Sequence, residues 1–368
     1  MIRPISAFLT VLIAGGVLIG IGRPGRGTPL WTGARYTRQY RDQAIRRGLT
    51  FMYSSIANDP ADFKEYGHDL LAAFYNIGVT SGDPELRRMA WTMGHERALE
   101  WRRIHPVIPP DTNVNDLTDL VFGDDAAGRL GVPDARMHTA LREAAAHFSV
   151  IDYLQFDPLK EPPPSDIPKQ CEKCNHMNRR GLTVCERCGN KLEMQNRYDL
   201  YQDALINSYT GDRTGITLGA HYVDVLHWLP VMRPYPPRLP HNDADYYAGV
   251  YSVTHVVYTY NDYSQFRLSP ACFPEEVAHL KANLRQAVTE KDPETMGEYL
   301  DSLRSFGFSY DDELIQAGFD YLLSIQNQDG SWGDVKDPNP YGRYHPTWTV
   351  IDGLRDYRWT RVLPCPAF

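Results

Sequence analysis

Residues 317–332 read AGFDYLLSIQNQDGSW, and this stretch decides which fold the sequence predicts. Its first half carries apolar and aromatic residues, Tyr321 among them, at the spacing of an amphipathic helix. Its second half runs from Gln326 through Gly330 to Trp332 and contains the Asn, Asp and Gly residues typical of a turn. A second helix-like segment, HPTWTVIDGLRDY, follows shortly afterwards. The stretch therefore predicts a helix that ends in a turn and leads into another helix.

The order of Gln326, Gly330 and Trp332 resembles the Gln-Trp repeat of the terpenoid cyclase and protein prenyltransferase superfamily, whose members include squalene-hopene cyclases. The resemblance implies an α/α toroid and a long apolar isoprenoid as substrate. It covers one clear repeat, and an ordinary helix end followed by a turn is the alternative. The Asp-x-Asp-Asp acid motif of class II cyclases and the Asp-rich magnesium motifs of class I enzymes are missing. Standard squalene cyclisation is therefore not expected.

A second sign of a repeat is a set of similar turn segments, in which Gly with Pro or Asp ends one helix-like stretch and starts the next. Their glycines are Gly82, Gly131, Gly211 and Gly307. One spacing is enlarged by about the length of a Pro-rich, cysteine-containing segment at 161–195. Without that insertion the period is roughly 48 residues, which indicates an array of helical hairpins. The period requires one further turn near residue 259.

Six hairpins follow from this period. Their first helices are expected near 36–57, 84–103, 134–154, 213–229, 274–290 and 311–326. Their second helices are expected near 62–78, 114–127, 196–210, 245–260, 294–306 and 345–358. Six hairpins suit an all-α (α/α)6 toroid whose second helices form the inner ring, because closure covers the apolar ends that an open array exposes. An open solenoid is the alternative.

Four cysteines, Cys171, Cys174, Cys185 and Cys188, form the pattern CEKC-x10-CERC. Two close pairs across a loop can place four thiolates around one zinc ion. Vicinal disulfides and an iron-sulfur centre are the alternatives. A four-cysteine site has no open position, so this zinc is expected to be structural. A zinc-ribbon-like module at 161–195 is therefore expected in a loop of the toroid, where it covers one mouth or binds a protein partner.

The N-terminus carries a nearly continuous apolar run at 5–21, with arginines on both sides. Its length is about the minimum for a membrane-spanning helix, and the basic residues that follow it favour a cytoplasmic body. A cleaved secretion signal and a buried or interfacial helix are the alternatives. We expect a single-pass membrane protein, with the anchor at 1–27. The remaining cysteines, Cys272 and Cys365, are expected to be free thiols, which agrees with a reducing compartment.

The domain prediction has four parts. They are the anchor at 1–27, the first part of the toroid at 28–160, the zinc-ribbon-like insertion at 161–195 and the second part of the toroid at 196–368. The net charge is −8 at pH 7, so a nucleic-acid partner is not expected. The many aromatic residues suit either an apolar cavity or plain helix packing.

Candidate catalytic residues are sought on the expected inner helices, where polar side chains would face a central cavity. His345 resembles the zinc-binding histidine of protein prenyltransferase beta subunits, but the accompanying Asp-x-Cys pair is missing. Asp352 shares a helix face with His345. His255 and Tyr258 form one stripe that could act as acid–base groups or as a structural hydrogen-bonded seam. A second metal could be held where His68, His255 and His345 converge.

Three functions remain open. The first is a membrane-anchored terpene-cyclase-like enzyme that acts on or binds an isoprenoid or other lipid. The second is a non-catalytic binding or assembly protein that uses the toroid and the zinc module. The third is a polysaccharide-active enzyme, because (α/α)6 barrels also carry carboxylate pairs that cleave sugars. A closed aromatic pocket favours the first, a filled centre the second and an open carboxylate-lined cleft the third.

Overall fold

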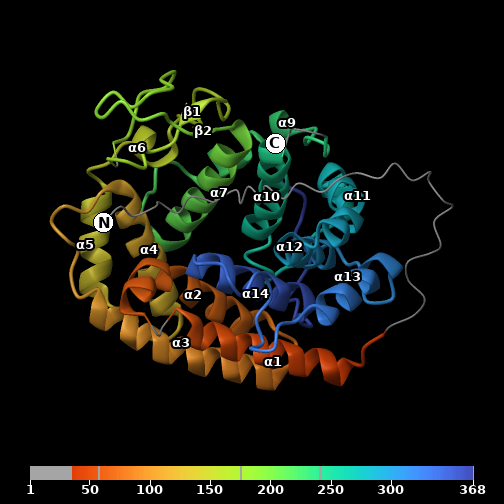
Figure 1. Cartoon of the computed structure of the whole chain (residues 1–368). Coiled ribbons are helices and arrows are strands. Elements are labelled where there is room, and N and C mark those ends of the chain that lie inside the picture. Colours follow the sequence, from red (N-terminus) through yellow and green to blue (C-terminus); the bar gives the residue numbers. More distant parts are fainter. Residues whose placement is uncertain (1–34, 57–58, 175, 240–242, 368) are drawn as a thin grey trace.

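The computed structural model describes residues 35–56, 59–174, 176–239 and 243–367. This part of the chain is mainly helical, as expected for an all-α protein (Figure 1). Its only regular strands form one short antiparallel pair within these residues, in which Ile167 faces Gln195.

The helices follow one another as long antiparallel pairs and short connecting turns. The long helices are α1 (Arg38–Ser55), α2 (Pro60–Thr80), α3 (Pro84–Ile104), α4 (Val114–Arg129), α7 (Arg197–Thr214), α10 (Asp243–Tyr260), α11 (Pro274–Glu290), α12 (Pro293–Ser305), α13 (Glu313–Ser324) and α14 (Pro340–Leu354). The shorter elements are α5 (Ala135–Ala145), α6 (Val150–Leu154), β1 (Ile167–Pro168), β2 (Met194–Gln195), α8 (Tyr222–Leu226), α9 (Leu229–Met232) and the 3-10 turn η1 (Pro270–Cys272).

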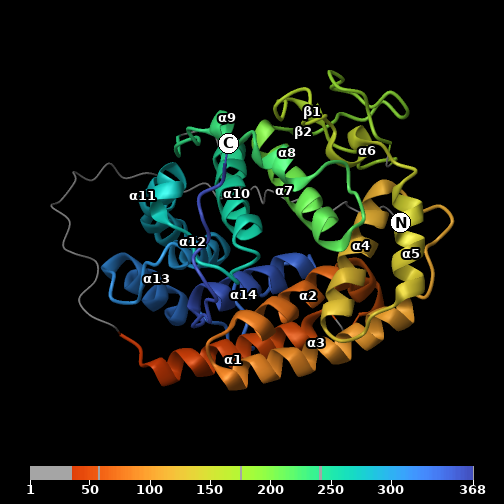
Figure 2. The ribbon, with the colours of Figure 1, turned by 180° about the vertical axis from the view of Figure 1, so that it is seen from behind.

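Six helices contact one another in a cycle: α2 packs on α4, then α4 on α7, α7 on α10, α10 on α12, α12 on α14, and α14 on α2. We call these six the inner helices. Other helices pack against individual members of the six, as α3 does on α2 and α11 on α12. In both views of the molecule, α1 and α3 run side by side along one edge (Figures 1 and 2).

The inner helices run in the same direction, because contacts between neighbours advance together along both chains. Between α2 and α14, Asp69 accepts a hydrogen bond from Tyr344, and Ser81, beyond the end of α2, accepts one from Arg355, beyond the end of α14. The contacts between α10 and α12 advance in the same way. The N-terminal ends of the inner helices therefore share one side of the cycle.

Each of the twelve expected helical segments overlaps a helix of the structure. The turn required near residue 259 also exists, because α10 ends at Tyr260 and left-handed residues follow it at Asp262, Tyr263 and Ser264. The caps explain most of the starts. For example, Asp83 accepts a hydrogen bond from the Glu85 amide at the start of α3, and Asn113 does the same for two amides of α4.

Three local predictions were wrong. No continuous helix spans 213–229, because Gly215 and Gly219 have left-handed backbones and the chain forms only α8 and α9 afterwards. Gly211, expected in a turn, lies inside α7. The last helix, expected near 345–358, begins earlier: α14 begins at Pro340 and contains Pro346.

The stretch at 317–332 packs against α1, which is far from it in the sequence. The buried Trp332 indole donates from Nε1 to the carbonyl oxygen of Leu322 (2.7 Å), and Gln326 Nε2 donates to the carbonyl oxygen of Ala44 in α1 (2.8 Å). The indole also lies over Gly48, where an added Cβ would come within 2.7 Å of the ring. The turn after α13 is thereby fixed against α1.

The segment at 161–195 has a small core of its own, in which Leu192 packs against cysteines. It lies beside α6 and α7 at one edge of the molecule (Figures 1 and 2). Asn115, near the start of α4, donates to Gln170 (3.4 Å), and Asn196, at the start of α7, donates to Asp245 near the start of α10 (3.0 Å). The segment therefore lies at the side of the cycle where inner helices begin.

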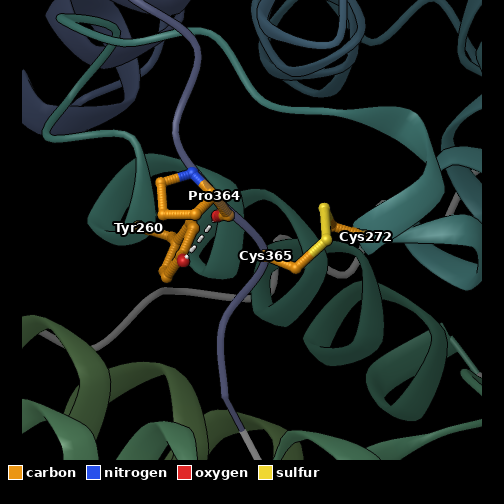
Figure 3. The surroundings of a disulfide bond; sticks show 4 residues. All are labelled: Tyr260, Cys272, Pro364 and Cys365. Carbon is orange, nitrogen blue, oxygen red and sulfur yellow. Dashed lines mark hydrogen bonds between the residues drawn. A yellow bond between two sulfur atoms is a disulfide. The ribbon is translucent and has the colours of Figure 1, made fainter.

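The C-terminal residues return across the molecule after α14. The Arg358 amide donates to the carbonyl oxygen of Thr80 at the end of α2 (2.7 Å). Further along, the Tyr260 hydroxyl donates to the carbonyl oxygen of Pro364 (2.9 Å; Figure 3). The tail is thus fixed at both ends of its path.

A disulfide joins Cys272 to Cys365, with 5.1 Å between their Cα atoms (Figure 3). The prediction that both are free thiols was therefore wrong. The sequence hides this pairing because the two cysteines are 93 residues apart and meet only when the tail folds back. Disulfides are more usual in oxidising compartments, so the bond does not support the expectation of a reducing one.

No helix among the described residues is long and apolar enough to cross a membrane. The apolar run at 5–21 lies outside the described residues.

Candidate functional site

A polar seam runs between α12 and α14, the most closely packed pair of inner helices. The helices approach closely because each presents a glycine: a Cβ on Gly297 would lie 2.5 Å from the backbone of Thr349, and one on Gly353 would lie 2.8 Å from the Gly297 oxygen. Along this seam α12 presents Glu294, Glu298 and Asp301, and α14 presents His345, Trp348 and Asp352. The spacings place each set on one helix face.

His345 lies in the half of the seam that is formed by the N-terminal turns of α12 and α14. Its side chain is 9% exposed, and its Nδ1 lies 3.2 Å from Glu294 Oε1. Its ring stacks on Tyr341, with 4.5 Å between ring centroids. Burial alone would lower the pKa of His345, but the carboxylates, Glu294 first, outweigh burial and raise the pKa to about 9.

The two glutamates differ in their surroundings. Burial, aided by the charge of Glu294, raises the pKa of Glu298 to about 8, and its carboxylate accepts a hydrogen bond from Thr254 (2.6 Å). Burial also acts on Glu294, but the charge of His345 outweighs it and lowers the pKa of Glu294. Glu294 accepts a hydrogen bond from the Tyr251 hydroxyl (3.0 Å).

The neighbouring helix α10 brings His255 and Tyr258 to the same seam. His255 is buried, and burial lowers its pKa to about 4, so its ring is neutral at pH 7. Its Nδ1 lies 2.8 Å from the Tyr251 carbonyl oxygen, which assigns the proton to that nitrogen. The Tyr258 ring packs edge-on against His255, with 5.5 Å between ring centroids.

Asp301 and Asp352 lie in the other half of the seam, which is formed by the C-terminal turns of α12 and α14. Burial, with the adjacent charge of Asp352, raises the pKa of Asp301 to about 7, and burial also raises the pKa of Asp352. The hydroxyls of Ser264 and Tyr357 donate to Asp301, and Arg355 donates to Asp352 (2.7 Å). The two carboxyls interact, so their titration belongs to the pair, which holds a proton near neutral pH.

The structure thus brings four predicted site residues together on two helices that both pack on α12: His255 and Tyr258 lie on α10, and His345 and Asp352 lie on α14. His68 points to another neighbour: its Nε2 lies 3.5 Å from Asp119 Oδ1 on α4.

Carboxylates line the other inner helices as well. Asp69, Asp119 and Asp203 each keep partial exposure although they lie between helices. Burial raises the pKa of Asp119, and it raises that of Asp203 to about 7.

Two hollows beside α1 do not reach this seam. One has a volume of about 10 Å³ and lies near Arg46 and Arg355, and the other has about 120 Å³ and lies near Tyr40 and Gln326. Both are smaller than the pockets of about 300–1,000 Å³ that hold drug-sized ligands.

The four cysteines at 171–188 form a separate cluster. The sulfur atoms of Cys171 and Cys188 lie 3.4 Å apart, and those of Cys174 and Cys185 lie 3.6 Å apart. Ligands about 2.3 Å from a tetrahedral zinc ion are about 3.8 Å from one another. Backbone amides hold the loops, as Gly189 does by donating to the Cys185 oxygen (2.9 Å). The four thiols therefore lie at distances compatible with zinc.

Sequence reasoning missed Glu294 and Tyr251. The usable signal was the pair Glu294 and Glu298, four residues apart on an expected inner helix and therefore on one face. Nothing in the sequence aligned that face with His345, because the register between α12 and α14 depends on where Gly297 and Gly353 meet.

No protein-family model matches the chain, and comparison with curated proteins and with solved structures gave no match.

Proposed function

We propose that the helices form an (α/α)6 toroid, in which the short helices α8 and α9 stand in for the expected helix at 213–229, and that the seam between α12 and α14 belongs to its central wall. Support comes from the cyclic contacts of the inner helices and from their common direction. The contact of Trp332 with Gly48 supports closure between the last hairpin and the first helix. The anchor at 1–27 and the zinc-ribbon-like module at 161–195 complete the proposal.

On this framework the protein is an enzyme that acts on an isoprenoid or other lipid by proton transfer from the Asp301–Asp352 pair. The observation that carries this proposal is a buried pair of interacting carboxyls, in which Ser264 and Tyr357 donate to Asp301 and burial raises the pKa of Asp301. When the pair gives its proton to an alkene, Arg355 balances the carboxylate that remains and aromatic faces stabilise the cation. Loss of a proton from the cation back to the pair completes the step and restores the acid. The partial exposure of Asp352 makes it the member that meets the substrate.

Each neighbouring residue has a defined part in this proposal. Arg355 holds Asp352 in place, while Ser264 and Tyr357 hold Asp301. Tyr258 and Trp348, both partly exposed, present ring faces to the developing positive charge. The pair thereby fulfils the role of the missing Asp-x-Asp-Asp acid with residues from two helices.

The test is turnover of lipid substrates by the full chain in detergent. Lipids that copurify are identified by mass spectrometry, and squalene and linear polyprenols serve as added substrates. Asp352→Asn is expected to reduce turnover by at least 100-fold, in the range that a general acid contributes. Asp311→Asn, at an exposed position before α13, is the matched control and should retain full rate. Equal rates for both variants would remove the aspartate pair from the reaction.

A polysaccharide-active enzyme is the second candidate. The partly exposed carboxylates Asp69, Asp119 and Asp203 favour it, because glycosidases act through pairs of carboxylates in a polar cleft. Release of reducing ends from polysaccharides, without turnover of any lipid, would select this candidate. Activity on neither class, together with a protein partner captured through the module, would select the binding and assembly function.

The zinc at the four cysteines is proposed as structural. Cys188→Ser is expected to remove one zinc ion per chain and to loosen the segment between β1 and β2, because a four-cysteine site depends on all its ligands. Zinc analysis and limited proteolysis measure the two effects.

Membrane anchoring by 1–27, with the body in the cytoplasm, remains a proposal. Its test combines membrane fractionation of the full chain with alkylation of Cys272 and Cys365 in intact cells. A reactive thiol pair supports the cytoplasmic side, whereas a fully formed disulfide supports the opposite side.

A further inference from the structure

The ligand-type atoms of Glu294, Glu298 and His345 all lie within 4.8 Å of one another. Two atoms bound to one metal ion at about 2.1 Å each can lie up to about 4.2 Å apart, so small side-chain shifts suffice to bring all three to one ion. The three groups come from two rigid helices that are fixed by the close approach at Gly297. The cluster is therefore built into the fold and does not depend on loop positions.

The buried imidazole nitrogen of His345 faces the carboxylates without a well-aligned hydrogen bond. His345 is 7% exposed, and its Nδ1 has no well-aligned hydrogen bond although Glu294 Oε1 lies 3.2 Å away. A buried polar atom without such a bond carries an uncompensated cost of desolvation. An ion between the nitrogen and the carboxylates would supply the missing interaction.

Hydroxyl groups of neighbouring residues donate hydrogen bonds that orient both carboxylates. Thr254 donates to Glu298 Oε2 at 2.6 Å and Tyr251 donates to Glu294 Oε1 at 3.0 Å. Outer groups of this kind fix the orientation of metal-binding side chains. Tyr341 stacks on the His345 ring and fixes the plane of the imidazole.

We infer that Glu294, Glu298 and His345 bind one divalent transition-metal ion, of which Zn²⁺ is the probe used below. One imidazole and two carboxylates suit zinc and the other first-row divalent ions. Three protein ligands leave at least one coordination position open for water or an oxygen of a ligand. This site is distinct from the four-cysteine cluster, which is closed.

The competing interpretation is a plain ion pair between protonated His345 and Glu294. In that interpretation Glu298 is a buried carboxyl beside the carboxylate of Glu294, and its hydrogen bond comes from the Thr254 hydroxyl. Both interpretations predict that His345→Ala weakens the fold. Only the metal site predicts an additional equivalent of metal.

The experiment measures metal content in the full chain, without any substrate. After dialysis against a weak chelator and reloading with Zn²⁺, the wild type is expected to hold two ions per chain. Glu298→Gln and Glu294→Gln are each expected to hold one, and Cys188→Ser is expected to retain the ion at the seam. Glu290→Gln, a partly buried glutamate bound to Arg238 on another face, is the matched control and should hold two.

Cobalt provides a second measurement. In the wild type Co²⁺ gives intense thiolate-to-cobalt bands from the four-cysteine site, whereas the seam gives only weak d–d bands. These weak bands should persist in Cys188→Ser and disappear in Glu298→Gln, while circular dichroism confirms that each variant is folded. One ion per wild-type chain, or two ions in a folded Glu298→Gln, overturns the inference.

The proposed metal site and the proposed aspartate acid lie on the same seam between α12 and α14, but the experiments distinguish them. Two ions per chain with no effect of Asp352→Asn on turnover would reject the aspartate mechanism and retain the metal site. A single ion per chain with a large effect of Asp352→Asn would do the reverse.

Discussion

At the scale of single residues, Asp203 shows how burial couples stability to pH. Burial is the main cause that raises its pKa to about 7, compared with its usual 3.8. The folded state therefore binds the proton more tightly than the unfolded state. The free energy of unfolding therefore falls as the pH rises from about 4 to about 7, because the folded protein must then bury a charged carboxylate. Above pH 7 the destabilisation by Asp203 has reached its full value.

Asp203→Asn removes this cost. We expect the variant to be more stable than the wild type above pH 7, by on the order of 2 kcal/mol once partial exposure is allowed for. The difference should vanish at pH 4. Urea unfolding of both proteins at each pH measures it, and a difference that is independent of pH would contradict the assignment.

A second residue, Trp332, connects the last hairpin with the first helix. Trp332→Ala is expected to cost about 3–5 kcal/mol of unfolding free energy, because it removes a fully buried ring and leaves a cavity over Gly48. Trp91→Ala, at a ring that is 39% exposed, is the control and should cost much less. Thermal unfolding compares the two, and similar losses would show that the contact with α1 is not essential.

The residue scale is also where the sequence was least informative. The motif around Gln326 and Trp332 predicted a helix and a turn correctly, since local chemistry determines both. It did not predict which groups would meet Glu294, because that contact depends on the register of helices about 50 residues apart.

At the scale of elements, the contact between α12 and α14 depends on the absence of side chains at Gly297 and Gly353. Gly297→Ala is expected to lower stability by about 2 kcal/mol or more, because the added methyl group meets backbone that cannot rotate away. Gly128→Ala in α4, whose added Cβ would find its nearest neighbour at 3.9 Å, should instead be neutral or slightly stabilising. Chemical denaturation tests this pair, and equal effects would contradict the packing argument.

Most helices could be predicted because capping residues and apolar periodicity are local. The failures have local causes too: two left-handed glycines after α7 interrupted the expected outer helix at 213–229. The hairpin period led to the correct helix order, but the turn assigned to Gly211 fell inside α7.

At the scale of the whole molecule, the Cys272–Cys365 disulfide closes a loop of 93 residues. The double variant Cys272→Ser/Cys365→Ser is expected to lose about 2–4 kcal/mol, since the unfolded chain regains the freedom of a long loop. Denaturation in the absence of reductant measures the loss. The single variant Cys272→Ser should show a similar loss, because either substitution breaks the bond, and an unchanged midpoint in the double variant would contradict the expectation.

The packing of α14 against both α1 and α2 has a consequence for biosynthesis. Among the described helices α1 is synthesised before α14, so the apolar faces around Ala44 and Leu49 lack their partner in α14 until α14 has been made. A nascent chain arrested before residue 340 leaves this apolar surface exposed and lacks His345. Premature termination before residue 340 should therefore yield an insoluble product, and never a partly active one.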